Sequence, residues 1–308
     1  MLGLKDLTRD QIVQILETAT RMKAWMAAGD EKLDELKGRA VINLFFEPST
    51  RTRASFELAA RKLSADLMTM TPQASSLTKG ESLKDMVENL EAMGPALLVV
   101  RHAASGVPGL ISRYTKAAVI NAGDGSHEHP TQGLLDLFTV CESLKIHDWN
   151  LKGLNLLIVG DLAYSRVARS NLYGFRKLGA RVTCVGPATL LPPGLESFGA
   201  RVGTDLDREL PDADVVMLLR IQKERQEKMN FPSLVEYTRF YGLTRERHHK
   251  MKASALIMHP GPINRGVEID PDVADSKAGQ GAKTVILDQV NHGVPVRMAV
   301  LSHWGRPA

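Results

Sequence analysis

One stretch of the sequence gathers hydroxyl and guanidinium groups at the start of a predicted helix. It is Ser49-Thr50-Arg51-Thr52-Arg53, and it follows an apolar run, Ala40 to Phe46, that predicts a buried strand. Free N–H groups at a helix N-terminus, together with hydroxyls and a guanidinium, suit the several acceptor oxygens of a phosphate. A surface helix capped by Ser49 with solvated arginines is the competing interpretation. The three hydroxyls around Arg51 favour the anion site.

A second polar segment, Gly123 to Gln132, also follows an apolar run and leads into a predicted helix. It carries His127 and His129. Two histidines two residues apart, without a nearby third ligand, are a weak case for a metal, so hydrogen-bonding roles are favoured. Pro130 suits the first helical position, which directs the preceding His129 toward the end of the strand. We therefore expect no metal site and no cofactor.

Two further segments place arginines just after apolar runs. The turn after Val159 contains only Gly160, whereas a dinucleotide-binding turn needs three closely spaced glycines, so a nucleotide is not favoured. Arg166 lies at a predicted helix start, from which a guanidinium reaches a carboxylate. Beyond Leu219, alternation places Arg220 and Gln222 on one face. The residues that follow, Lys223 to Arg225, are expected to begin a solvated helix.

The elements that must position these groups alternate between helix and strand. Thr8 and Gln11 predict a capping box that opens the first helix. Strand-like runs occupy 40–46, 66–70, 96–100, 117–121, 154–159, 181–185, 214–219 and 255–258, with helical patterns between many of them. The predicted fold class is therefore α/β, with two doubly wound domains, each a parallel sheet flanked by helices.

A polar break around residues 143–152 predicts the link between the two domains. At 308 residues the chain is long enough for two domains of about 150 residues each. We expect domains at 1–143 and 144–284, with a C-terminal helix at about 285–308 that returns to the first. The segment from Asn230 to Lys252 lacks strong periodicity and predicts a long loop.

Composition restricts the partners of the chain. The net charge is only +4 and the basic residues are scattered, so a nucleic-acid surface is not indicated. The longest apolar runs are far shorter than the roughly 20 residues of a membrane helix, and the first residues mix acidic and basic side chains, unlike a secretory signal. Cys141 and Cys184 lack paired spacing. We expect a cytoplasmic location, no membrane contact and a small anionic substrate.

Together these segments resemble the transcarbamoylase family over essentially the whole chain. Ser49 to Arg53 is similar to the family's carbamoyl phosphate motif, and His129-Pro130-Thr131-Gln132 to the second motif as the aspartate branch carries it. Ornithine enzymes usually have Cys at the position of Thr131. The run Arg220 to Arg225 also resembles the aspartate branch, and the Ser-Met-Gly and His-Cys-Leu-Pro signatures of the ornithine branch are missing.

The resemblance implies roles for individual residues. Carbamoyl phosphate would be held by Ser49, Thr50, Arg51, Thr52, Arg101, His129, Gln132, Gly261 and Pro262. L-Aspartate would be bound by Lys79, Arg166, Arg220 and Gln222. The catalytic residues would be Arg51, Thr52, Lys79, Arg101 and His129. Gly261 departs from the pattern, since well-known relatives have Leu or Ala there.

The resemblance also implies an assembly and a reaction. Ser75, or its neighbour Ser76, and Lys79 resemble a loop that family members lend to a neighbouring subunit of a homotrimer. The residues 264–269 resemble those of bacterial forms found as bare trimers or paired with a dihydroorotase-like chain. The implied reaction moves the carbamoyl group of carbamoyl phosphate to the amine of aspartate, early in pyrimidine nucleotide synthesis.

Three alternatives remain open at this point. They are transfer to ornithine, transfer to another amine, and a homologue without catalysis that serves in assembly. A homologue that has lost catalysis should lack hydroxyl or charged groups at the substrate, whereas every position named above keeps a suitable side chain. The missing ornithine signatures favour aspartate.

Overall fold

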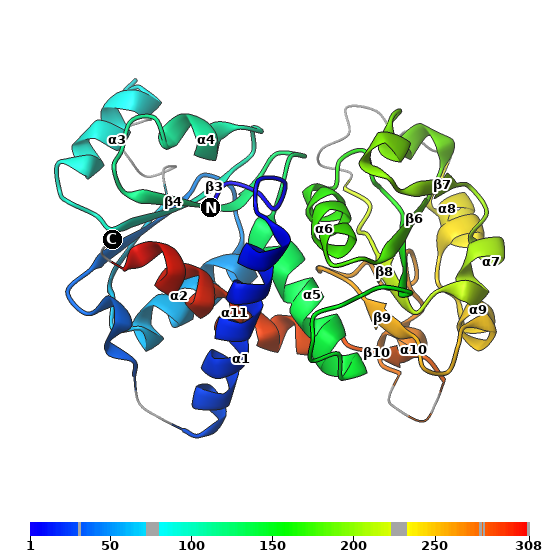
Figure 1. The fold of residues 1–308 in the computed structure, drawn as a ribbon. Helices are drawn as coiled ribbons and strands as arrows, with labels where there is room; N and C mark the ends of the chain where they lie inside the picture. The colour runs from blue at the N-terminus through cyan, green and yellow to red at the C-terminus, as the bar shows by residue number, and fades with distance from the viewer. Residues whose placement is uncertain (30–31, 72–79, 223–232, 277–278, 280, 307–308) are drawn as a thin grey trace. The chain divides into compact units, whose positions relative to one another are not determined.

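The computed structural model describes residues 1–29, 32–71, 80–222, 233–276, 279 and 281–306 (Figure 1). The chain forms two compact units. Unit 1 comprises Met1–Leu135 together with Val290–Ala308, and unit 2 comprises Asp136–Gln289. In the described part of the chain, no helix is both long and apolar enough to span a bilayer.

Unit 1 is built on a four-stranded sheet in the order β2-β1-β3-β4, in which every neighbouring pair is parallel. The strands are β1 (Ala40–Phe45), β2 (Asp66–Met70), β3 (Leu97–His102) and β4 (Ala118–Asp124). The chain runs from β1 outward to β2, then returns to β3 on the other side of β1. The carboxyl ends of β1 and β3 therefore lie side by side at a topological switch point, where open parallel sheets bind ligands.

Helices cover both faces of this sheet, as the apolar strands require. They are α1 (Arg9–Ala27), α2 (Thr50–Lys62), α3 (Leu83–Glu91), α4 (Val107–Ile111), the start of α5 (Pro130–Leu144) and most of α11 (Ile286–Gly305). Figure 1 shows α3 and α4 on one face and α1, α2 and α11 on the other. On the first face, Ile42, Leu44 and Val100 pack against Met86 and Ile111.

The two ends of unit 1 confirm expectations from the sequence. Thr8 caps α1, and the predicted capping box with Gln11 is present in both directions. Helix α11 packs on unit 1, where the Arg297 guanidinium donates to Ser55 Oγ at 3.0 Å and lies 5.2 Å from the centre of the Phe56 ring. The predicted return of the C-terminal helix is therefore confirmed.

Unit 2 contains a six-stranded parallel sheet in the order β10-β9-β8-β5-β6-β7. Its strands are β5 (Asn155–Val159), β6 (Arg181–Val185), β7 (Arg201–Gly203), β8 (Val215–Leu218), β9 (Leu256–Met258) and β10 (Lys283–Thr284). The chain runs from β5 outward to β7 and then continues at β8 on the other side of β5. The switch point of this sheet thus lies between β5 and β8.

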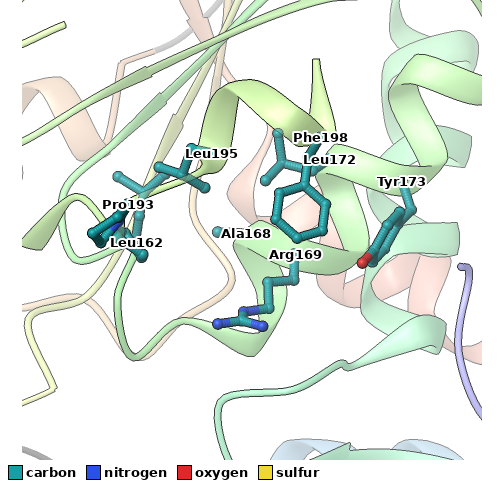
Figure 2. A pocket seen from close by; sticks show the side chains of 9 residues that line it. Leu162, Ala168, Arg169, Leu172, Tyr173, Pro193, Leu195 and Phe198 are labelled. Atoms are coloured by element: carbon teal, nitrogen blue, oxygen red, sulfur yellow. The ribbon is translucent and has the colours of Figure 1, made fainter. Parts of the chain in front are cut away.

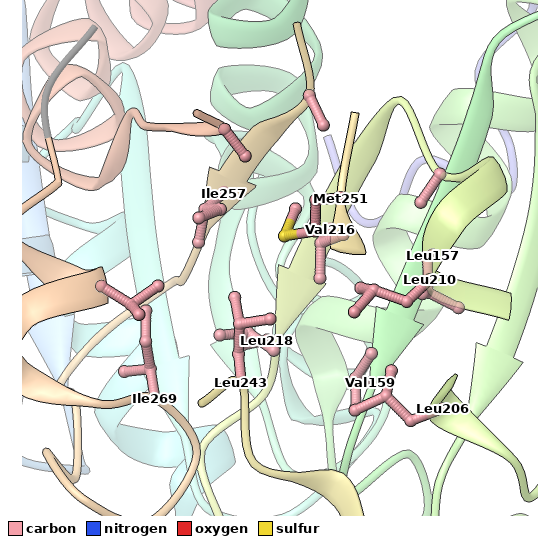
Figure 3. Close-up of a cluster of buried hydrophobic side chains, with 14 of the residues drawn as sticks. Leu157, Val159, Leu206, Leu210, Val216, Leu218, Leu243, Met251, Ile257 and Ile269 are labelled. Atoms are coloured by element: carbon pink, nitrogen blue, oxygen red, sulfur yellow. The ribbon is translucent and has the colours of Figure 1, made fainter. Parts of the chain in front are cut away.

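Helices again cover the faces of the second sheet. They are α6 (Arg166–Lys177), α7 (Leu206–Glu209), α8 (Leu234–Tyr241), α9 (Arg245–Lys250) and α10 (Pro271–Ala274). Residues opposite one another in neighbouring strands, such as Leu157, Val216 and Ile257, form one continuous core with Leu206 of α7 and with Met251, the residue after α9 (Figure 3). The two parallel sheets with their helices confirm the predicted fold class.

Three features of unit 2 differ from the sequence analysis or were missed by it. The strands β7 and β10 were not predicted, because both are short edge strands without an apolar run. The predicted loop from Asn230 to Lys252 is wrong over its described part, where α8 and α9 form. Each has a capping side chain, Ser233 and Thr244, but is too short to show a clear period. The boundary between the units falls within α5.

The core of unit 2 generates a stability prediction. We expect Leu218→Ala to lower the free energy of unfolding by about 2–5 kcal/mol, because a fully buried side chain in a close-packed strand leaves a cavity. Val235→Ala is the control, because that side chain is 81% exposed; its effect should stay within about 0.5 kcal/mol. Urea unfolding followed by circular dichroism measures both. Equal effects of the two changes would contradict the assigned core.

Candidate active site

The predicted phosphate segment lies at the N-terminus of α2. Ser49 is the N-cap by backbone conformation, but its side chain makes no capping hydrogen bond, so the competing interpretation of Ser49 as a capping side chain is wrong. Thr52 is buried and Arg51 is accessible. Partial burial lowers the pKa of Arg51, and no described carboxylate offsets that effect. Hydroxyls, N–H groups and a guanidinium therefore remain available to an anion.

Arg101 enters the same edge of the sheet from the neighbouring strand. The pairing of β1 with β3 sets Phe45 opposite Arg101, and the Phe46 N–H donates to the Arg101 carbonyl at 2.9 Å. The guanidinium donates to the Ala122 carbonyl at 3.2 Å and lies 3.6 Å from a carboxylate oxygen of Glu47. The structure thus brings Arg101 to the edge where Ser49 to Thr52 lie. Glu47, which the sequence analysis did not assign, orients it.

The histidine segment follows β4 at this edge. His127 Nδ1 lies 3.1 Å from Asp124 Oδ2, so the favoured hydrogen-bonding role of His127 is confirmed. Burial raises the pKa of Asp124, but hydrogen bonds from His127, Gly106 and Asn121 outweigh it and hold the pKa below its ordinary value. Asp124 therefore stays charged and fixes the turn. Among the residues the structure describes, no group of three or more His, Cys, Asp or Glu could hold a metal.

The residues that follow the turn are buried. His129 is 4% exposed and Gln132 is 9% exposed. The N–H of Gln132 donates to the His129 carbonyl at 2.9 Å, and α5 begins at Pro130 as predicted. Both side chains therefore belong to the first turn after β4, at the carboxyl edge of the unit 1 sheet.

In unit 2, Arg166 and Arg220 follow the two adjacent strands of the switch point. Val159 of β5 pairs with Leu218 of β8, and the Leu219 N–H still donates to the Val159 carbonyl at 2.8 Å. Arg166 is the first residue of α6 and is 4% exposed. Arg166 and Arg220 therefore follow neighbouring strand ends at one edge of this sheet.

The backbone around these arginines is held by Asp161. This residue is fully buried, and its carboxylate accepts the N–H of Tyr164 at 3.1 Å and of Gln222 at 3.4 Å. Gly160 beside it has φ 124°, and a Cβ there would lie 2.7 Å from the Tyr237 hydroxyl. The lone glycine of this turn is therefore required by close packing, although it forms no nucleotide motif.

Gly261 and Pro262 lie in the loop after β9, the strand next to β8. Gly261 has φ 65°, in the left-handed region that favours glycine. Its N–H donates to His259 Nδ1 at 2.8 Å. The loop thus belongs to the same carboxyl edge of the unit 2 sheet.

Several predicted residues lie outside the described part of the chain. They are Ser75, Ser76 and Lys79, and also Lys223, Glu224 and Arg225. The sequence analysis in turn missed the acidic groups that support the site, namely Glu47, Asp124, Asp161 and Glu268. A signal was present for three of them, since Glu47, Asp124 and Asp161 each stand within a few residues of the end of a predicted strand.

A separate pocket of about 230 Å³ lies in unit 2 (Figure 2). Its walls are mostly apolar and include Leu162, Leu172, Leu195 and Phe198, while Arg169 and Tyr173 supply the polar groups. None of the predicted site residues lines it. Apolar walls do not suit a small, doubly charged substrate, so we assign the unit 2 part of the site to the sheet edge instead.

Both halves of the chain match models of one protein family. Residues 1–142 match the aspartate/ornithine carbamoyltransferase carbamoyl phosphate-binding domain, and residues 152–304 match the Asp/Orn-binding domain of the same family. This chain belongs to the aspartate/ornithine carbamoyltransferase family. The two models leave 143–151 unmatched, the region where the sequence predicted a link between domains.

The chain is also similar to individual members of this family. The aspartate carbamoyltransferase catalytic subunit of Syntrophobacter fumaroxidans is 54% identical over 99% of this chain and 97% of its own length. The aspartate transcarbamoylase of Trypanosoma cruzi, solved with carbamoyl phosphate and aspartate, aligns with a TM-score of 0.86 at 26% identity, covering all of this chain and 95% of that one. The ornithine carbamoyltransferase of Pyrococcus furiosus aligns with 0.84 at 27% identity, covering 98% and 95%.

If the hydroxyls and N–H groups at the start of α2 bind an anion together with Arg51, removing that guanidinium should weaken the binding. Arg51→Ala should weaken the binding of inorganic phosphate by about 10- to 100-fold, because charge-assisted hydrogen bonds to an anion are among the strong ones. Isothermal titration calorimetry measures the affinity. Arg61→Ala is the matched control, since Arg61 is an exposed arginine in the last turn of the same helix, far along the chain from its N-terminus. Unchanged affinity in Arg51→Ala would remove Arg51 from the site.

Proposed function

We propose that this protein transfers the carbamoyl group of carbamoyl phosphate to the amine of L-aspartate, giving N-carbamoyl-L-aspartate and phosphate. The proposal makes it an enzyme of pyrimidine nucleotide synthesis that acts in the cytoplasm. The 54% identity to a relative named as an aspartate carbamoyltransferase catalytic subunit supports the activity. The family and the sheet-edge geometry support it independently.

Two arginines at the unit 2 switch point favour aspartate over ornithine as the acceptor of the carbamoyl group. Arg166 and Arg220 follow adjacent strands, so their charges lie at one edge, where two carboxylates would bind. Aspartate has two carboxylates, whereas ornithine would bring a second ammonium group toward these cations. Like charges in one site are repulsive, so this geometry favours aspartate over ornithine.

The chemistry follows from the groups assigned to the two substrates. The amine nitrogen attacks the carbamoyl carbon and forms a C–N bond, which places negative charge on the carbonyl oxygen. Thr52, Arg101 and His129 would stabilise that oxygen. The bond from carbon to the phosphate oxygen then breaks, and the phosphate accepts the amine proton. Ser49, Thr50, Arg51 and Gln132 hold the donor, and Gly261 and Pro262 contact it through the backbone.

Much of the acceleration in this proposal comes from alignment. Carbamoyl phosphate is already activated, and both substrates are anions that repel each other in water. A cationic site offsets that repulsion and converts an encounter of two molecules into a step within one complex. No covalent enzyme intermediate is required, because the amine can attack the activated carbamoyl carbon directly and phosphate is the leaving group.

If Arg220 binds aspartate, its removal should affect the two substrates differently. Arg220→Ala should raise KM for aspartate strongly, because removing a buried charge partner of a ligand costs about 2–5 kcal/mol. Carbamoyl phosphate affinity should stay close to that of the wild type. Steady-state kinetics with each substrate varied in turn measures both. Arg208→Ala, a highly exposed arginine of the same unit, is the control. Equal weakening of both substrates would make Arg220 structural.

We further propose that the active unit is a homotrimer in which Ser75 and Lys79 of one subunit complete the site of its neighbour. These residues lie outside the described part of the chain, so the proposal rests on the family resemblance. The Lys79 ammonium would add positive charge near both substrates. A dihydroorotase-like chain is the proposed further partner, and copurification with only a zinc-bearing regulatory subunit would contradict that choice.

A hybrid experiment tests the shared site. Inactive Lys79→Ala chains and inactive Arg51→Ala chains are mixed, allowed to exchange subunits and assayed. Some interfaces in mixed trimers contain an intact Arg51 from one chain and an intact Lys79 from the next, so activity should partly return. Each mutant taken through the same exchange alone is the control. If each chain supplied its own lysine, every site would keep one defect and no activity would return.

A further inference from the structure

One buried carboxylate in unit 2 connects two segments that the site uses. Glu268 is 1% exposed. Its Oε1 accepts the backbone N–H of Ile221 at 3.1 Å and the side-chain amide of Asn264 at 2.8 Å, and its Oε2 accepts the Asn264 N–H at 3.0 Å. The segment Arg220–Gln222 and the loop that carries Gly261 and Pro262 are therefore tied to a single side chain.

These bonds matter because the backbone leaves the sheet at this point. Strand β8 ends at Leu218, and the last ladder bond in this direction is from the Leu219 N–H to Val159. Beyond it the N–H groups of Ile221 and Gln222 need other acceptors, since a buried N–H without one costs free energy. Glu268 accepts the first and Asp161 accepts the second. The direction in which Arg220 leaves the backbone is thereby fixed.

The charge of Glu268 is costly to bury. Burial raises the pKa of Glu268, and the donors on Ile221 and Asn264 oppose that shift. Tyr237, which is fully buried nearby, is an uncharged phenol with a raised pKa, so it does not neutralise the carboxylate. An apolar side chain of similar size often serves stability equally well at such a position. Stability alone therefore does not explain the buried Glu268 carboxylate. The positions in which it holds Ile221 and Asn264 explain it better.

We propose that Glu268 is a positioning residue for the amino-acid substrate, holding Arg220 and Gln222 in the arrangement that receives aspartate through its bond to the Ile221 N–H, with Asn264 as the anchor that keeps the carboxylate in place. This inference rests on the function proposed above and adds a residue that the sequence motifs did not assign. Glu268 acts through the backbone of its neighbours and does not itself touch the substrate. Its loss should affect aspartate more than carbamoyl phosphate, whose phosphate binds to unit 1 in the proposed function.

The test replaces Glu268 with glutamine, which keeps size and shape. An amide has one acceptor oxygen in place of two. With that oxygen at the Oε1 position the Asn264 backbone N–H loses its bond, and with it at the Oε2 position the Ile221 N–H and the Asn264 side-chain amide lose theirs. We expect KM for aspartate to rise about 10-fold or more, in line with a lost hydrogen bond to a charged group, while KM for carbamoyl phosphate changes by less than roughly twofold. Hydrogen exchange of the peptide that contains Ile221 or of the one that contains Asn264 should accelerate, because one of the two segments loses its acceptor.

Asp214→Asn is the matched control. Asp214 is also a carboxylate that joins two segments of this unit, accepting the Asn155 N–H at 2.8 Å and the Lys252 ammonium at 2.7 Å. It immediately precedes β8, so it lies at the amino edge of the same sheet, away from the proposed site. We expect Asp214→Asn to lower the melting temperature without changing KM for aspartate.

The outcomes separate the inference from the proposed function. A folded Glu268→Gln enzyme with unchanged KM for aspartate would overturn the inference alone. So would an equal rise in both variants, because Glu268 would then act only on general stability. If the wild-type enzyme produced no carbamoyl aspartate, the proposed function would fail and the positioning role with it. Should Glu268→Gln not fold, Asn264→Ala, which removes one donor to Glu268, gives the same comparison.

Discussion

The constraint on which the rest of the structure depends is the parallel pairing of both sheets. All strands of one sheet end at the same edge, and reversal of the winding direction leaves two neighbouring strand ends uncovered. In unit 1 these are the ends of β1 and β3, which bring the hydroxyl segment at α2 beside Arg101. In unit 2 they are the ends of β5 and β8, and the segments that follow them carry Arg166 and Arg220. The topology thus collects cations that are far apart in the sequence.

A parallel sheet that ends in polar loops must also satisfy the backbone groups that leave it. In this protein buried carboxylates perform that task at both edges. Asp124 accepts the N–H groups of Gly106 and Glu128 in unit 1, at 2.7 and 3.2 Å. Asp161 and Glu268 do the same for the residues after β5 and β8.

The same arrangement lowers the cost of placing several cationic groups close together. A small dianion needs several cationic and N–H donors, and such donors repel one another when the site is empty. Placing them at a helix start, at strand ends and beside fixed carboxylates such as Glu47 limits that cost, because each group is oriented by its own element. Preorganised donors lose little conformational freedom when a ligand binds.

The sequence by itself determined the parts of this protein that depend on local pattern. Apolar runs located the inner strands, Thr8 and Gln11 located the start of α1, and the motif from Ser49 to Arg53 located the polar start of α2. The sequence did not predict the short edge strands β7 and β10, because their pairing with neighbouring strands defines them and their own composition does not. The helices α8 and α9 were missed for a related reason, since each is too short for periodicity to emerge.

Only the tertiary structure decided which acidic residues support the site. Glu268 is 47 residues from Ile221, and Glu47 is 54 residues from Arg101, so no local pattern records either contact. Whether a carboxylate is a solvated surface group or a buried acceptor depends on burial and on donors brought by other strands. The sequence therefore specified the groups that we propose bind the substrates, and the packing of the sheets decided which carboxylates hold their segments in place.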